Sequence, residues 1–298
     1  MFKTNYFRSK RTLLFKVILF CGFLYLLVSR CQKLDFSKIE IESYWAFIGC
    51  LLLTPINWFF EWLKWKLIIE NIDEKYNSSN FKAFSSGIIS SFLTPALSGN
   101  FLGRMLFYDK SKRWNITILS SVANFSQFLV AILFGFLAIT CSNESFPVKL
   151  NLYVFISFSI VLIIVYFFGE RIAEKMQIKQ LQLFCDQIRK GPSRLKFLGL
   201  SLFRYIIFII QYALALKAFG IDVVFETINY ILIVFLLITL TPSLFFGKIM
   251  VRESIAVTIF GIAGYEIIPI VFASFTTWFF NLFLPAAIAL LIVKKTSR

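Results

Sequence analysis

The sequence predicts an all-α polytopic membrane protein, a chain that crosses the bilayer several times as helices. Hydrophobic residues make up 58% of the 298 residues and the mean hydropathy is +0.77, whereas soluble domains are only about 45–50% apolar. Charged residues are 16% of the chain and lie mostly outside the long apolar stretches. Because each charge inside a span costs about 2.5–3.5 kcal/mol, this pattern is typical of a protein whose solvent is lipid.

Six apolar stretches are long enough to cross a bilayer as helices, at about 1.5 Å per residue. The first follows a basic head, and no small-residue cleavage site comes after it, so we expect a retained anchor rather than a signal peptide. Two more apolar segments, 84–106 and 226–263, contain glycine and proline, and we expect broken or re-entrant helices there. The six predicted spans are residues 12–29, 44–70, 115–140, 149–168, 197–219 and 268–293.

Lysine and arginine predict the orientation of the chain. The N-terminal head, the segment 169–196, the short "YDKSKRW" stretch and the C-terminal tail are all basic, which favours the cytoplasmic side of an inner (plasma) membrane for each, and hence for both termini. We treat residues 1–298 as a single integral membrane domain. Segment 169–196 mixes apolar and basic positions, which indicates either an amphipathic cytoplasmic helix linking two halves or a solvated linker.

Composition also argues against several functions. The net charge of +15 lies mainly in short loops beside the spans, which favours anionic lipid headgroups as partners over nucleic acid. The chain has no histidine, and its five cysteines form no C-x-x-C pair, so we expect no metal site and no cofactor. No aspartate cluster typical of lipid-linked transferases occurs either, which disfavours an enzyme.

A weak internal repeat joins the two interrupted segments, "FLTPALSGNFLGR" and "TLTPSLFFGKIMVR". Each reads Leu-Thr-Pro, then a glycine, then an arginine, so an inverted repeat is one interpretation. Paired breaks in two halves of a membrane protein are typical of transport sites, because a broken helix exposes backbone groups that must face a polar cavity. The matched residues are Pro95, Gly99 and Arg104 in the first segment and Pro242, Gly247 and Arg252 in the second.

Arg104 and Arg252 offer permanently charged, planar guanidinium groups suited to phosphate. Gly99 and Gly103 let the chain bend or pack closely. We therefore predict an anionic headgroup site at the breaks. The alternative is that Arg104 reaches back to the headgroups from a cytoplasmic helix end, while the glycines serve helix packing.

The stretch "TPINWFFEWLKWK" carries two helical faces. Trp58, Trp62 and Trp65 share one face, and Glu61 and Lys64 lie on a neighbouring face with Asn57. An interfacial tryptophan belt and a Glu61–Lys64 pair explain this stretch without any function. An acidic side chain at this depth also needs a partner, and Arg104 is a candidate for that role.

Other polar residues within the spans are more typical of contacts between helices than of ligand binding. Pro285 is expected to kink the last span. The polar residues are Asn124, Ser126, Gln127, Arg204, Tyr205, Gln211 and Asn281.

The order and spacing of "LTPINWFFEWLKWKLII", "SSFLTPALSGNFLGRMLF", "VANFSQFLVAILFG", "LFRYIIFIIQY" and "LTPSLFFGKIMVRES" resemble the transmembrane region of the lysylphosphatidylglycerol synthase family, a group of flippase-like integral membrane proteins. Gly99, Gly103, Arg104 and Arg252 match the family pattern. Three positions depart from it: Leu97 and Asn100 stand where an arginine and a glutamate are common, and Lys248 where an acidic residue is usual.

The resemblance implies an inner-membrane protein that translocates lipid. Synthases proper continue into a soluble transfer domain, so we expect this chain not to be a complete synthase. We expect it to bind or translocate an anionic or glycosylated lipid, with Glu61, Lys64, Asn100, Arg104 and Arg252 near the headgroup. The alternatives are a non-catalytic membrane subunit that works with partner proteins in lipid or polysaccharide assembly, and a membrane-embedded transferase.

Overall fold

Every regular element that the structure describes is a helix. The computed structural model describes residues 40–72, 78–93, 98–142, 151–174, 179–241 and 247–295. The helices are α2 (Tyr44–Asn71), α3 (Ser78–Leu93), α4 (Ser98–Met105), α5 (Lys110–Thr140), α6 (Leu152–Glu174), α7 (Lys179–Lys190), α8 (Arg194–Ala218), α9 (Phe225–Leu240), α10 (Gly247–Ile262), α11 (Ile267–Trp278) and α12 (Leu284–Lys295), with a π-helical turn, Phe279–Phe283, joining the last two.

Five helical segments are long and apolar enough to cross a membrane, which confirms an all-α polytopic membrane fold. They are Tyr44–Asn71, Lys110–Thr140, Leu152–Arg171, Arg194–Ala218 and Ile267–Val293. Each coincides with a predicted span, although α5 begins five residues before the apolar stretch, with its basic first turn. The remaining predicted span, 12–29, lies outside the described residues.

Both interrupted segments contain two helices with a break between them. α3 packs against α4, and α9 packs against α10, so each segment turns back on itself. The eight residues of α4 are about 12 Å long, and the 16 residues of α3, α9 and α10 about 24 Å, less than the ~30 Å of a hydrocarbon core. Pro95, Leu97 and Pro242 lie in the gaps, outside the described residues, and Gly247 and Lys248 begin α10.

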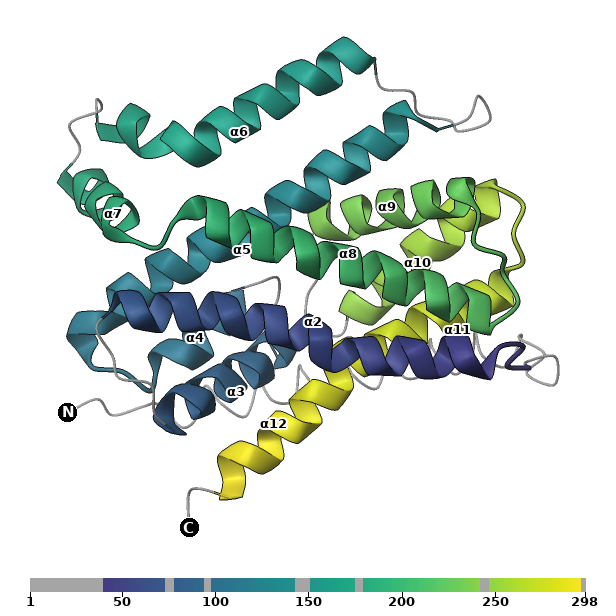
Figure 1. The fold of residues 1–298 in the computed structure, drawn as a ribbon, viewed down its shortest axis with the longest axis horizontal. Coiled ribbons are helices and arrows are strands. Elements are labelled where there is room, and N and C mark those ends of the chain that lie inside the picture. Colours follow the sequence, from purple (N-terminus) through teal and green to yellow (C-terminus); the bar gives the residue numbers. More distant parts are fainter. Residues whose placement is uncertain are drawn as a thin grey trace, which may run out of the picture. The chain divides into compact units, whose positions relative to one another are not determined.

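The arrangement of helices around α2 positions the candidate site. α2 and α8 run side by side along much of their length (Figure 1), and α5 packs against α8 and α9. A buried apolar cluster joins α2, α3, α5 and α12, with Trp65, Ile68 and Phe84 among its members. Trp65 is fully buried in this cluster, so the prediction of a tryptophan belt at the membrane interface is wrong for this residue.

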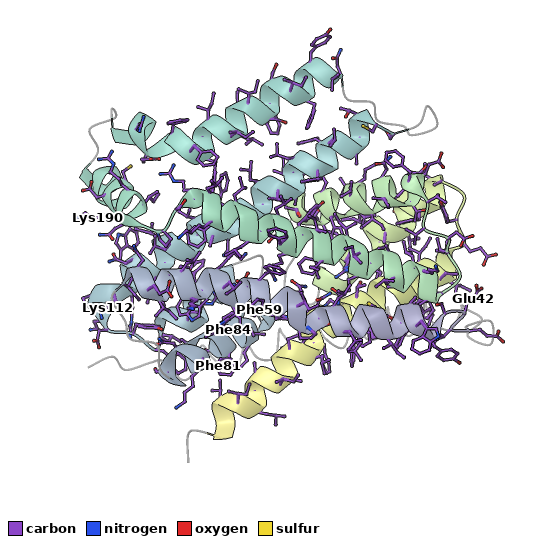
Figure 2. The ribbon with its side chains drawn as sticks, viewed as in Figure 1. Glu42, Phe59, Phe81, Phe84, Lys112 and Lys190 are labelled. Carbon is purple, nitrogen blue, oxygen red and sulfur yellow. The ribbon has the colours of Figure 1, made fainter. Side chains whose placement is uncertain are left out.

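Two of the basic segments lie at one end of the helices. Lys112, at the start of α5, and Lys190, at the end of α7, lie at the end of α2 opposite Glu42 (Figure 2). Asn71, the last residue of α2, donates from Nδ2 to the Lys190 carbonyl oxygen at 2.7 Å. Segment 169–196 therefore contains a helix, α7, with buried Cys185 on one side and exposed Arg189 and Lys190 at its end.

The predicted irregularity at Pro285 has a specific form. A proline has no N–H for the carbonyl four residues earlier, which here belongs to Asn281, and the helix widens into the π-helical turn Phe279–Phe283 just before the proline. The Asn281 carbonyl instead accepts a hydrogen bond from Trp58 Nε1 at 3.2 Å. This hydrogen bond thus links the π-helical turn of the last span to α2.

Candidate functional site

A buried polar seam runs along α2, which is otherwise a hydrophobic helix. Its five residues are spaced alternately four and three apart, so they share one face, and all are at most 6% exposed. The seam extends over 15 residues, from Cys50 to Lys64, or about 21 Å along the axis, and α8 packs along α2. The polar seam consists of Cys50, Thr54, Asn57, Glu61 and Lys64.

Glu61 is the centre of a charged cluster at one end of the polar seam. Its Oε1 accepts from Arg104 Nη2 at 3.0 Å and from Asn100 Nδ2 at 3.1 Å. Its Oε2 lies 2.8 Å from Arg204 Nη1 and 2.9 Å from Lys64 Nζ. The predicted pairs of Glu61 with Lys64 and with Arg104 are therefore both confirmed, and one carboxylate joins α2, α4 and α8.

The cluster is largely buried and lined by aromatic rings. The side chains of Glu61, Lys64 and Arg104 are at most 3% exposed, and that of Arg204 is 16% exposed. Arg104 Cζ lies 4.8 Å from the Trp65 ring centroid and 5.1 Å from that of Phe84. Arg204 Cζ lies 5.7 Å from the Trp58 centroid. These distances allow cation–π attraction, which is strongest where water is absent.

The cluster contains more positive than negative charge. Within the described residues, Lys64, Arg104 and Arg204 all pair with the single carboxylate of Glu61, so three cations face one anion. Arg104 Nε also has no hydrogen-bond partner among those residues, although Arg104 is only 2% exposed. Burying an unbalanced charge is costly, so an additional anion at this place would stabilise the cluster.

Side-chain amides form a hydrogen-bonded network along the rest of the polar seam, on the side away from Glu61. Asn57 accepts from Arg204 Nε at 2.8 Å and donates to Asn281 Oδ1 at 2.7 Å. Asn281 in turn donates to Gln211 Oε1 at 2.8 Å, and Gln211 Nε2 donates to the Cys50 carbonyl and to Thr54 Oγ1. Gln211 and Asn281 are thus confirmed as contacts between helices, α8 and the π-helical turn binding α2.

Arg252 contacts residues other than those of the charged cluster. It extends from α10 and donates from Nη2 to Thr277 Oγ1 at 2.6 Å, with the rings of Tyr212 and Phe235 within 6 Å of its Cζ. Its Nε has no hydrogen-bond partner among the described residues. Arg104 and Arg252 share no partner within that part of the chain, so a single headgroup site containing both arginines stays a prediction.

Glycines bring α4 close enough to α3 to place Arg104. A Cβ on Gly103 would collide with the Ser86 carbonyl and the Ser90 hydroxyl, so the prediction of close packing is confirmed there. A Cβ on Gly87 of α3 would lie 2.8 Å from Arg104 Cγ and from the Asn100 carbonyl oxygen. Gly99 is also buried, at the second position of α4. These small residues let Asn100 and Arg104 reach Glu61.

Two components of the cluster were not assigned to the site from the sequence. The prediction that Arg204 makes a contact between helices is confirmed, since it joins α8 to Asn57 and Glu61 of α2. The sequence does not predict that this contact is part of the hydrogen-bonded group around the Glu61 carboxylate. The available signal was the charge itself, since a lone arginine deep in an apolar span needs a partner. Among the described residues no group of three or more Cys, Asp or Glu side chains is arranged to hold a metal ion.

Comparisons of this chain with protein-family models, with curated proteins and with solved structures give no match. The resemblance to the lysylphosphatidylglycerol synthase transmembrane region therefore stays a prediction, and the geometry of the cluster carries the functional argument.

Proposed function

We propose that this chain binds an anionic membrane lipid by its headgroup and moves that headgroup across the membrane, as a flippase-like protein. The observation that most supports this proposal is the buried cluster in which Lys64, Arg104 and Arg204 share one carboxylate. Guanidinium groups bind phosphate through two parallel hydrogen bonds. A bound phosphate would balance charge that the described part of the protein leaves unbalanced.

The helix breaks support movement of the bound headgroup. Arg104 is on α4, the short arm of a hairpin with α3, whereas Glu61 and Arg204 are on long spans that pack along each other. A short re-entrant arm can shift relative to two spans with less loss of packing than a full helix. In this proposal, motion of the α3–α4 hairpin exposes the cluster first to one side of the membrane and then to the other.

The distribution of basic residues supports an orientation. Lys112 and Lys190 lie at the same end of the helices (Figure 2), and basic segments favour the cytoplasmic side. We therefore propose an inner (plasma) membrane location with this end, and both termini, in the cytoplasm. Binding of the lipid rather than a chemical reaction on it is the proposed activity.

A reconstitution experiment tests the proposal. We expect vesicles that contain the chain to move headgroup-labelled phosphatidylglycerol between leaflets, and Arg104→Gln to slow this movement by about 10- to 100-fold, because a hydrogen bond to a charged group contributes about 1.5–3 kcal/mol. Glu61 keeps Arg204 and Lys64 as partners in this variant. The measurement is the rate at which an external quencher becomes able to reach the label.

Arg171→Gln is the matched control. Arg171 is an exposed arginine at the end of α6, so its loss removes the same charge without touching the cluster, and the rate should stay within about twofold. Equal rates in vesicles with and without the protein would refute the proposal, and so would equal losses in the two arginine variants.

A further inference from the structure

An apolar groove lies beside the charged cluster, on the far side of two aromatic rings. It is formed by α2, α3 and α12 and has a volume of about 430 Å³, within the ~300–1,000 Å³ typical of small-ligand sites. Its lining is almost entirely apolar, and Leu52, Phe81 and Ile288 at its surface are 42–62% exposed. The groove is lined by Leu51, Leu52, Thr54, Pro55, Trp58, Phe81, Phe84, Ser85, Ile88, Leu284, Pro285, Ile288, Ala289 and Ile292.

Trp58 and Phe84 form a wall that faces both the groove and the cluster. Both line the groove, and their rings meet edge to face at 6.1 Å. The same rings contact the cluster, since Phe84 is 5.1 Å from Arg104 Cζ and Trp58 is 5.7 Å from Arg204 Cζ. These two side chains therefore form a boundary that the groove and the cluster share.

We infer that the groove holds one acyl chain of the anionic lipid whose headgroup the cluster binds, an inference that rests on the proposed function. A phospholipid matches the chemistry on both sides of the Trp58–Phe84 wall. The cluster has an excess of positive charge among the described residues, and Arg104 Nε has no hydrogen-bond partner there. The groove offers apolar surface, and a phospholipid is a molecule in which an anionic phosphate and an apolar chain are a few bonds apart.

A second cavity differs in its chemistry and serves as a control. It has a volume of about 410 Å³ and lies between α2 and α8. Its lining includes the charged residues Lys66, Glu70 and Lys196, and neither Trp58 nor Phe84 contributes to it. An acyl chain has no reason to prefer this cavity, although it is nearly equal in size to the groove.

Photolabelling of the full chain in vesicles tests the inference. The probe is phosphatidylglycerol with a diazirine on one acyl chain, and mass spectrometry locates the labelled residues. We expect labels on α3 and α12 groove residues. Ile288→Trp should reduce them by about tenfold or more, because a bulky side chain and an acyl chain cannot share the same space. Ile288 is 50% exposed, so the larger side chain is compatible with the fold.

Gly199→Trp is the matched filling variant for the second cavity, where a Cβ on Gly199 meets no atom within 4 Å. It should leave groove labelling unchanged. Phosphatidylcholine with the same labelled chain should label the groove about tenfold less, since its headgroup has no net charge for the cluster. Equal labelling by the two lipids, equal effects of the two tryptophans, or labels confined to other helices would overturn the inference.

The two proposals fail in different ways. If Arg104→Gln slows transport but the acyl probe labels other helices, the acyl-chain inference is wrong and the proposed function stands. If the protein transports no lipid and Arg104→Gln changes neither labelling nor headgroup preference, the proposed function is wrong as well.

Discussion

Replacement of Glu61 by glutamine is expected to cost about 3–5 kcal/mol of the free energy of unfolding, the usual loss when one partner of a buried ion pair is removed. The carboxylate is the shared partner of Lys64, Arg104 and Arg204, and all but Arg204 are at most 3% exposed. Glutamine keeps the size of the side chain but removes the one carboxylate that pairs with these three cations among the described residues. The measurement is denaturant unfolding in mixed micelles.

The exposed pair of Lys66 and Glu70 provides the control for Glu61. It lies on the same helix, with 3.8 Å between Lys66 Nζ and Glu70 Oε1, and both side chains are more than half exposed. Glu70→Gln should change the unfolding free energy by less than about 1 kcal/mol, as is usual for surface ion pairs. If Glu61→Gln were as mild as Glu70→Gln, the cluster would not be the charged centre of the fold that we describe.

Gly103→Ala is expected to destabilise the protein by about 1–3 kcal/mol, the usual cost of overpacking. The added Cβ would collide with the backbone carbonyl of Ser86, and a backbone atom cannot move aside as the end of a flexible side chain can. The helices α3 and α4 would have to separate, which would also draw Arg104 away from Glu61. The same unfolding experiment measures the loss.

Gly199→Ala is the matched helical substitution, because a Cβ at Gly199 meets no atom within 4 Å. It should raise stability by about 0.5–1 kcal/mol, the ordinary preference of a helix interior for alanine over glycine. If Gly103→Ala and Gly199→Ala lowered the free energy of unfolding by similar amounts, the close packing of α3 on α4 would make no specific contribution to stability.

The spans and the Glu61 pairs could be predicted because membrane insertion makes both easy to recognise. Long apolar runs cross the bilayer whatever their neighbours are, and a carboxylate inside such a run needs a cation. Lys64 is one turn away on the same helix. Arg104 is predicted as a partner because it follows an interrupted helix, where polar groups need a polar environment.

The role of Arg204 could not be predicted because it depends on how α8 lies against α2. Sequence spacing shows that Arg204 and Gln211 share one face of a helix, but it does not show which helix that face meets. Only the packing of α8 along α2 brings Arg204 within 2.8 Å of Glu61 Oε2.

The irregular helix near Pro285 likewise depends in part on a neighbouring helix that the sequence does not identify. Pro285 predicts an irregular helix, because the missing N–H frees the Asn281 carbonyl. The form of the irregularity, a π-helical turn, and the partner of that carbonyl, Trp58, come from the neighbouring helix. The two interruptions are likewise predicted by the sequence, as broken or re-entrant helices, whereas the choice between these two forms comes from the packing of α3 on α4.

The central claim is that the Glu61 cluster is a site for an anionic headgroup, and native mass spectrometry of the intact protein in micelles tests it most directly. We predict that wild-type protein retains phosphatidylglycerol about 10- to 100-fold more tightly than phosphatidylcholine with the same chains, and that Arg104→Gln removes this preference while Arg171→Gln keeps it. Equal retention of the two lipids by the wild-type protein, or a preference that survives in Arg104→Gln, would contradict the claim.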